Sequence, residues 1–204
     1  MNDANTTWLQ PVTLAGRHVR LEPLAPAHVE GLQRAAADGE LWTLWYTSVP
    51  APDATAAYVD TALALQAQGL ALPFVVRDGS GEVVGCTRFG NVDAGNRRVE
   101  IGWTWYARRV QRTALNTEAK LLLLTHAFEA LDCAAVEFRT SWFNHASRNA
   151  IARLGAKQDG VLRNHMRMAD GTYRDTVVFS IIAGEWPMVK RHLRFKLEPR
   201  EAAP

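Results

Sequence analysis

The chain has 204 residues, 48% of them hydrophobic and 22% charged, which is typical of a globular protein with one sizeable core. Its 23 basic and 21 acidic residues leave a formal charge of +2, which excludes the strongly basic face of a nucleic-acid-binding domain. The 2 cysteines, Cys86 and Cys133, are too isolated for a metal site or a disulfide framework, and they favour a reducing compartment.

The first residues, MNDANTTWLQP, contain neither the cationic start nor the apolar run of a signal peptide. The chain also lacks an uninterrupted apolar stretch of roughly 18 residues, the length that a membrane span needs. We therefore expect a cytoplasmic protein that forms a single domain over 1–204, with an ordered core at about 14–197 and short loose termini.

Hydrophobic periodicity and turn residues predict the elements of the first half of the chain. They are a strand over 18–24, a helix over 25–38, a helix over 54–68, and a hairpin over 71–92 that turns at Asp78-Gly79-Ser80-Gly81. Pro52 and Asp53 introduce the second helix and Gly69 stops it, as helix boundary signals require.

The second half of the chain alternates strands and helices. The pattern predicts a strand over 97–107, a helix over 117–131, a strand over 134–141, a helix over 145–155, a hairpin over 160–182 and a helix that begins at Pro187. The apolar side of the 117–131 helix consists of Ala119, Leu122, Leu123, Ala127 and Ala130. This order of elements predicts a mixed α/β (α+β) sheet in one domain.

The segment RRVQRTALNTEAK, residues 108–120, joins a strand to a helix and is suited to an anion. N–H groups at a helix start are unpaired and lie at the positive end of the helix dipole, where phosphate binds. Arg108, Arg109 and Arg112 add positive charge. The alternative is that Asn116 only caps the helix and the arginines are solvated, because asparagine is a favoured cap.

A second helix start lies in the segment NHASRNAIARLG, residues 144–155. Asn144 precedes this helix and Ser147 follows at the third position beyond it. Capping explains this N-x-x-S pattern when it is taken alone, with Gly155 closing the helix.

Together these segments resemble the GNAT superfamily of N-acetyltransferases, in the branch that contains the RimJ and RimL ribosomal-protein N-terminal acetyltransferases. The matching text is GRHVRLEPL (16–24), VEIGWTW (99–105), NTEAKLLLLTHAFEAL (116–131), NHASRNAIARLGAKQDGVLR (144–163) and DGTYRDTVVFSIIAGEWP (170–187). The resemblance covers nearly the whole chain. It implies a GNAT-like fold, with a central, mostly antiparallel seven-stranded sheet that is splayed in the middle and flanked by helices.

The resemblance implies that acetyl-CoA is the co-substrate, that its pyrophosphate is the bound anion, and that no metal takes part. The family signature Q/R-x-x-G-x-G/A falls on residues 111–116, where Ala114 replaces the usual glycine and Asn116 the final Gly or Ala. Because alanine lacks the freedom of glycine at positive φ, we expect the loop to follow a different path. The pantetheine arm is expected beside residues 99–106, like an added strand.

The cofactor-binding residues that the resemblance implies lie in three groups. They are Trp103, Thr104 and Trp105 on the strand, Gln111, Arg112, Thr113, Ala114, Leu115, Asn116 and Thr117 in the loop, and Asn144, Ser147 and Arg153 at the second helix.

Acetyl transfer to an amine needs a base, a donor for the oxyanion, and a hydrogen bond or proton for the leaving thiolate. Glu100 is the candidate base, and the alternative is a surface glutamate on a half-exposed strand. The resemblance points to Ser147 as the acid, with helix capping as the alternative, and to a strand N–H as the oxyanion donor. Strict alternation predicts one strand face with Glu100, Gly102 and Thr104 and another with Ile101, Trp103 and Trp105. Cys86 and Cys133 are expected to be buried hydrophobes, which excludes a thiol nucleophile.

The candidate substrate-binding residues are mainly aromatic. They are Trp42, Trp45, Tyr46, Trp142 and His165. Core or dimer contacts explain the aromatic residues equally well, and a structural role explains His165. A protein N-terminal amine and a small-molecule amine both stay open as acceptors, as does a homodimer, whereas no nucleic acid or membrane partner is expected.

A protein of another class stays open as well. The altered loop would also suit a catalytically silent member that binds acyl-CoA as a sensor or a partner-binding module. An unrelated nucleotide-binding protein is disfavoured, because the chain contains neither G-x-x-x-x-G-K-[ST] nor G-x-G-x-x-G after a strand.

Overall fold

The computed structural model of the chain describes residues 8–168 and 170–198. The outer parts of both predicted loose termini, 1–7 and 199–204, lie outside the described residues. No helix within the described ranges combines the length and the hydropathy required to cross a bilayer.

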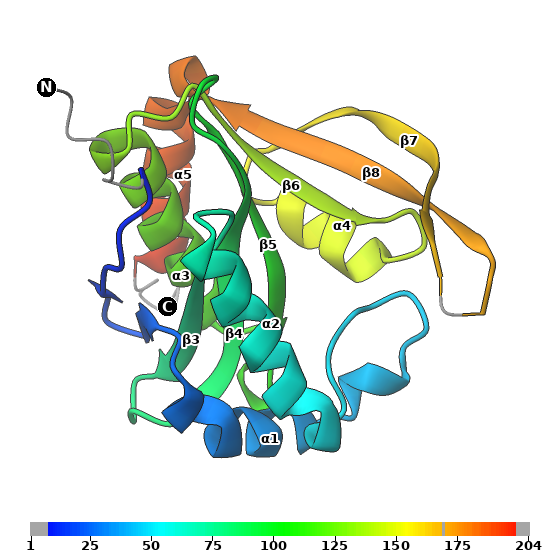
Figure 1. Ribbon diagram of the computed structural model, residues 1–204. Helices are drawn as coiled ribbons and strands as arrows, with labels where there is room; N and C mark the ends of the chain where they lie inside the picture. The colour runs from blue at the N-terminus through cyan, green and yellow to red at the C-terminus, as the bar shows by residue number, and fades with distance from the viewer. Residues whose placement is uncertain (1–7, 169, 199–204) are drawn as a thin grey trace, which may run out of the picture.

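The strands form one mixed sheet (Figure 1). In the described residues they are β1 (Leu14–Ala15), β2 (Val19–Pro23), β3 (Leu72–Asp78), β4 (Val83–Asp93), β5 (Arg98–Tyr106), β6 (Ala135–Ser141), β7 (Lys157–Arg167) and β8 (Tyr173–Ile182). Their order is β1-β2-β3-β4-β5-β6-β8-β7, and every neighbouring pair is antiparallel except β5 and β6. The predicted, mostly antiparallel sheet is confirmed, and it gains an eighth strand because the short β1 pairs with β2.

Helices cover both faces of this sheet. They are α1 (Val29–Ala37), α2 (Thr55–Ala67), α3 (Ala114–Thr125), α4 (His145–Ala152) and α5 (Trp186–Leu197). In Figure 1, α1 and α2 lie in front of β3 and β4, whereas α3 and α5 lie behind them. The short α4 packs on β6 and β8.

The core lies between the sheet and its helices. Phe74 of β3 and Phe89 of β4 are completely buried, and their rings meet edge to face at 5.9 Å. Leu32 of α1 and Leu123 of α3 are also completely buried. Both helices therefore turn their apolar side to the sheet, as their hydrophobic spacing predicts.

The helix predicted over 117–131 begins and ends elsewhere. It begins at Ala114, because the Thr113 side chain caps it by accepting a hydrogen bond from the Leu115 N–H at 3.3 Å. It ends at Thr125 and continues as a π-helical turn over His126–Ala130. The wider turn rotates the last residues, so Ala130 is exposed instead of facing the sheet.

The parallel pair β5 and β6 is joined over a short length only. Arg98, Val99 and Glu100 pair with Ala135, Val136 and Glu137. Beyond Glu100, β5 stays paired with β4 and β6 stays paired with β8, so the two strands separate. The sheet is therefore splayed in the middle, as predicted, and residues 101–106 of β5 have no partner strand on the β6 side among the described residues.

A buried carboxylate of α3 holds the turn between β1 and β2. The Glu118 side chain accepts main-chain hydrogen bonds from Arg17, His18 and Val19 at 2.9, 2.5 and 3.0 Å. Gly16 is needed for this approach, since a Cβ there would lie 2.4 Å from the Glu118 carboxyl carbon.

Replacing Glu118 with glutamine is expected to lower the free energy of unfolding by about 2–4 kcal/mol, because one amide oxygen cannot replace two carboxylate oxygens that accept three main-chain N–H groups. Urea unfolding at pH 7 measures this change. Glu30→Gln is the matched control, since Glu30 is an exposed α1 residue whose ion pair with Arg34 contributes roughly 0–1 kcal/mol. Equal losses in the two variants would contradict the anchoring role of Glu118.

Candidate active site

The site is built around an irregularity in β5. The register of β4 and β5 slips between Cys86 and Arg88, where both Trp103 and Thr104 lie opposite the single residue Thr87. Trp103 has a φ of 50°, in the left-handed region, which marks a β-bulge. Bulges redirect side chains, so the alternation predicted over 100–105 is interrupted at this point.

The bulge reverses the predicted faces of Trp103, Thr104 and Trp105, of which Trp105 lies opposite Cys86 on the α2 side. The Thr104 hydroxyl accepts a hydrogen bond from Lys120 of α3 at 2.7 Å, so Thr104 faces α3. The Trp103 ring lies 5.0 Å from the guanidinium of Arg88, which in turn lies over the ring of Tyr58 in α2. Trp103 therefore faces α2, and the prediction that it lies opposite to Glu100 is wrong.

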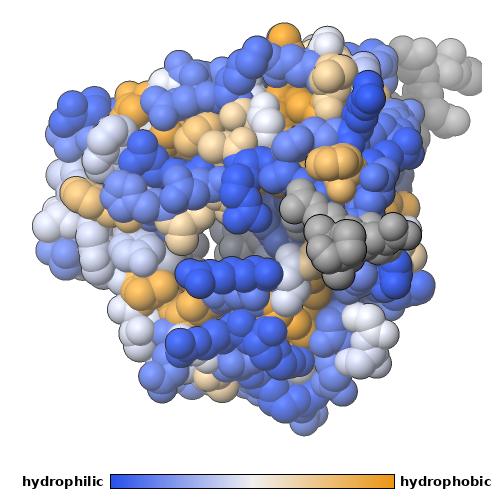
Figure 2. All heavy atoms as spheres, turned by 180° about the vertical axis from the view of Figure 1, so that it is seen from behind, coloured by the Kyte–Doolittle hydropathy of each residue, from blue (hydrophilic) through white to orange (hydrophobic). Residues whose placement is uncertain are grey.

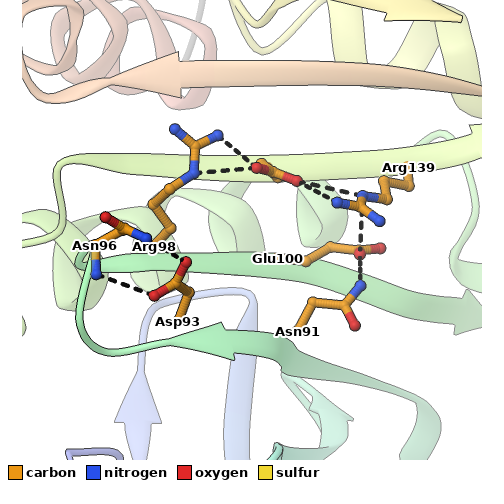
Figure 3. A network of polar contacts seen from close by, with 7 residues as sticks. Asn91, Asp93, Asn96, Arg98, Glu100 and Arg139 are labelled. Atoms are coloured by element: carbon orange, nitrogen blue, oxygen red, sulfur yellow. Dashed lines mark hydrogen bonds and ion pairs between the residues drawn. The ribbon is translucent and has the colours of Figure 1, made fainter. Parts of the chain in front are cut away.

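Glu100 is the last β5 residue that pairs with β6, so it stands where the two strands separate. It is 5% exposed, which rules out the alternative of a surface glutamate. Its Oε2 accepts a hydrogen bond from Asn91 Nδ2 at 2.6 Å and lies 3.6 Å from Arg139 Nε. Figure 3 shows Glu100 between these two side chains, which come from β4 and β6.

Burial dominates the protonation of Glu100. Desolvation raises the pKa of this carboxyl group, and the Asn91 hydrogen bond and the Arg139 charge oppose the rise without cancelling it. Glu137 adds a repulsive charge, although Arg98 and Arg139 both pair with it. A carboxylate with a raised pKa at the end of a separating strand pair has the properties of a general base.

The start of α3 lies directly beyond β5. Ala114 is the first residue of the helix and has a helical backbone, so its methyl group needs no freedom at positive φ. Arg112 carries the positive φ, at 61°. Ala114 therefore imposes no backbone strain at this position. The alternative that Asn116 caps α3 is wrong, since Thr113 is the cap and Asn116 lies within the first turn.

Two side chains tie this loop to the rest of the molecule. The Gln111 side chain donates a hydrogen bond to the Tyr106 carbonyl at 3.0 Å. Arg109 donates to Asp38 at the end of α1, through its N–H at 3.2 Å and its guanidinium at 3.4 Å. Arg109 is therefore neutralised, whereas Arg108 and Arg112 are exposed and enter no ion pair among the described residues.

The start of α4 lies directly beyond β6. Asn144 caps the helix, because its Oδ1 accepts a hydrogen bond from the Ser147 N–H at 3.0 Å. Capping is therefore confirmed for Asn144, and it holds Ser147 in place. Within the described residues the half-buried Ser147 hydroxyl makes no hydrogen bond of its own. Arg153 lies at the other end of α4, where its carbonyl contacts His192 of α5 at 3.2 Å.

The predicted substrate-binding aromatics partly come together. The Trp45 ring lies 5.5 Å from Tyr46 and 5.4 Å from Phe143, which follows β6. The segment between α1 and α2 therefore reaches the start of α4. Trp142 instead holds the Arg148 guanidinium at 4.3 Å from its ring. Figure 2 shows, from behind, a hollow near the middle of the molecule that is bordered mostly by hydrophilic side chains.

Two predicted residues lie away from this cluster. Trp42 belongs to a 3-10 turn over Leu41–Thr43 and forms no ring contact among the described residues. His165 lies on the exposed strand β7, where its Nδ1 is 3.0 Å from the Thr176 hydroxyl of β8.

Cys86 and Cys133 are both buried, as predicted. Burial raises the pKa of each thiol to about 11, so neither is a nucleophile at neutral pH.

Lys120 is a residue at this site that sequence reasoning misses. Its position on the polar-looking stretch NTEAK suggests a solvated lysine, yet it is only 6% exposed. Its amino group donates a hydrogen bond to Thr104 at the bulge, and the Thr104 hydroxyl also bonds Thr87 at 2.7 Å. Burial lowers the pKa of Lys120 to about 7.

This lowered pKa makes stability depend on pH. Between pH 7 and 10 the unfolded chain holds a proton on Lys120 that the folded chain has lost, so the free energy of unfolding rises with pH. We expect the wild type to gain about 1 kcal/mol per pH unit relative to Lys120→Met between pH 7 and 9. Urea unfolding of both proteins at pH 7, 8 and 9 measures this gain. A difference that stays constant with pH would show that Lys120 is protonated in the folded state throughout.

This arrangement is that of a GNAT-class protein: the strands splay, a helix starts beyond β5, and a buried carboxylate lies between them. The chain belongs to the acetyltransferase (GNAT) domain family, whose match covers residues 18–157. It is 31% identical to YdaF of Bacillus subtilis (strain 168), described as a candidate ribosomal N-acetyltransferase, over 106 residues. That match spans 52% of this chain and 57% of YdaF.

Solved structures show the same fold over nearly the full described length. A GCN5-related N-acetyltransferase from Brucella melitensis superposes with a TM-score of 0.85 and 30% identity, over 94% of this chain and 87% of that one. Mycobacterium smegmatis RimJ, solved in complex with CoA-disulfide, superposes with a TM-score of 0.77 and 25% identity, over 91% of this chain and 95% of that one. The predicted family, fold and similarity to RimJ are confirmed.

Proposed function

We propose that the protein transfers an acetyl group from acetyl-CoA to a primary amine, as one domain and by direct attack of the amine. The observation that supports this function best is the separation of β5 from β6 with Glu100 at the point of separation. It leaves main-chain groups of β5 unpaired beside a buried base. Either a protein N-terminal amine or a small-molecule amine would be the acceptor.

The residues present fit acetyl-CoA. The N–H groups of the first α3 turn, Ala114–Thr117, point out of the helix start and would hold the pyrophosphate, assisted by the unpaired Arg112. The free side of β5, around Trp103–Tyr106, would pair with the pantetheine amides. Arg153 lies at the far end of α4, where it would meet the adenosine phosphates. When bound, acetyl-CoA supplies the activated thioester.

Three groups of this chain would then serve the reaction. Glu100 accepts the proton of the amine, directly or through a water molecule. A main-chain N–H at the β5 bulge donates to the oxyanion. The Ser147 hydroxyl, held by the Asn144 cap, donates to the departing sulfur. The amine attacks the acetyl group itself, so no residue of the protein is acylated.

Thiol release from acetyl-CoA in the presence of a panel of amines tests this function, together with calorimetry of acetyl-CoA and CoA binding. Intersecting lines in double-reciprocal plots are expected, because both substrates must be bound together. Parallel lines would indicate an acylated enzyme and contradict direct attack. Cofactor binding without turnover of any amine would favour the silent acyl-CoA sensor, and absence of binding would overturn both functions.

A further inference from the structure

A groove opens on the α2 side of β4 and β5, next to the bulge. Its volume is about 370 Å³. It is lined by Ser48, Ala57, Tyr58, Thr61, Leu65, Arg88 and Trp103. Of these residues only Arg88 carries a charge, so it decides which ligands the groove accepts.

Arg88 is buried in an unusual way for an arginine. It is only 4% exposed, and its guanidinium lies between two rings, 5.2 Å from Tyr58 and 5.0 Å from Trp103. It enters no ion pair among the described residues. Arg77, Arg98 and Arg139 of the same sheet each pair with a glutamate.

The neighbours of Arg88 do not balance its charge. Burial raises the pKa of both Tyr58 and Cys86, so these groups are neutral at pH 7. Glu100 has Arg139 and Arg174 as its basic neighbours instead. A buried charge without a partner is costly, and the cost is offset when an anion binds against it.

The groove lies close to the proposed base. In the β4–β5 ladder Arg88 is opposite Gly102, and Gly90 is opposite Glu100, so Arg88 and Glu100 are diagonal neighbours on one face. Diagonal neighbours of this kind are roughly 7–8 Å apart. The Trp103 ring lies over Gly90, the residue opposite Glu100, where a Cβ would be 2.5 Å from the ring.

We propose that Arg88 binds a carboxylate of the acceptor, so that the acceptors are amines with a carboxylate a few bonds from the amino group. This rests on the proposed acetyl transfer. The planar guanidinium, fixed between two rings, offers two parallel N–H groups to a carboxylate. With the carboxylate held there, the amino group of the same small acceptor lies toward Glu100. The carboxylate belongs either to a small amino acid or to an acidic first residue of a peptide.

Paired acceptors test this proposal. One pair is a small amino acid and its α-carboxamide, alanine and alaninamide, which differ only in the carboxylate next to the amine. The other pair is two peptides that differ only in Asp or Asn as the first residue. We expect kcat/KM, followed by thiol release at saturating acetyl-CoA, to be at least 10-fold higher for the carboxylate member of one pair, and that pair identifies the source. Equal values within both pairs would overturn the proposal.

Variants connect the preference to the groove. Arg88→Gln should abolish the preference while leaving the acetyl-CoA Kd unchanged, and Arg88→Lys should restore part of it. Because Arg88 is buried, its replacement also perturbs packing, so a second variant at the exposed edge of the groove, Ser48→Asp, is needed. The added negative charge should lower kcat/KM for the carboxylate member of the pair about 10-fold. The kcat/KM for the carboxamide member should stay unchanged. A preference that survives both Arg88→Gln and Ser48→Asp would place the recognition elsewhere.

Failure of the proposed function gives a different result. If no amine is turned over, calorimetry of alanine and alaninamide with the CoA-loaded protein still tests the carboxylate site at Arg88. Binding of alanine that is lost in Arg88→Gln would support this site, and equal heats in wild type and variant would overturn it.

Discussion

Replacing Glu100 with glutamine is expected to lower kcat by about 10²- to 10⁴-fold, because the amide cannot accept the proton of the attacking amine. The acetyl-CoA Kd should stay unchanged, since Glu100 lies where β5 and β6 separate and not at the start of α3. Steady-state kinetics and calorimetry measure the two quantities. A variant that keeps its kcat would remove Glu100 from the mechanism.

The pH profile separates a base from a structural carboxylate. The base acts only when it is deprotonated, so wild-type activity should fall as the pH falls through the raised pKa of Glu100. Glu100→Gln should lose this acidic limb. Burial is the main cause of the raised Glu100 pKa, and repulsion by Glu137 is a smaller one. The matched control Glu137→Gln removes this repulsion, so the limb should move slightly to lower pH. An identical acidic limb in all three proteins would assign it to another group.

Replacing Asn116 with aspartate is expected to weaken acetyl-CoA binding by about 10- to 100-fold, through repulsion of the pyrophosphate by a charge within the first α3 turn. The same change should not weaken the helix, because an acidic residue near a helix start is favourable. Calorimetry measures the Kd, and thermal unfolding without ligand verifies the fold.

Asn116→Ala is the control for this prediction. It removes the side chain and keeps the main-chain N–H, so binding should stay within about 3-fold of the wild type if the backbone holds the anion. The loss in the aspartate variant should also shrink as salt is added, since salt screens repulsion between partly exposed charges. An unchanged Kd in Asn116→Asp would place the pyrophosphate elsewhere.

Sequence patterns predict the sheet elements well where the pattern is long and regular. The hairpin over 71–92 and the strand over 134–141 lie within one or two residues of β3, β4 and β6. Strand β7 begins at Lys157, before the predicted hairpin start at 160, because most of its side chains are exposed and an edge strand with little burial has a weak apolar pattern.

The local backbone conformation at the site depends on a β-bulge and on the choice of a helix cap, and hydrophobic periodicity predicts neither of them. One inserted residue at Trp103 reverses the faces of three site residues, Trp103, Thr104 and Trp105. A threonine at 113 competes with the asparagine at 116 for the capping position, and which of them caps depends on where the loop leaves β5. Both features depend on contacts with β4 and with the end of β5, which are distant from the local pattern.

The sequence alone determines the order of strands and helices along the chain and the presence of helices after β5 and β6, because these depend on neighbours within a few positions. It also supplies the residue types of the proposed base, the proposed anion loop and the Asn144 cap. The burial of Glu100, Lys120 and Arg88 is decided only by the tertiary structure. A charged side chain carries no local sign of its surroundings, and its protonation and its need for a partner depend on which distant elements exclude water from it.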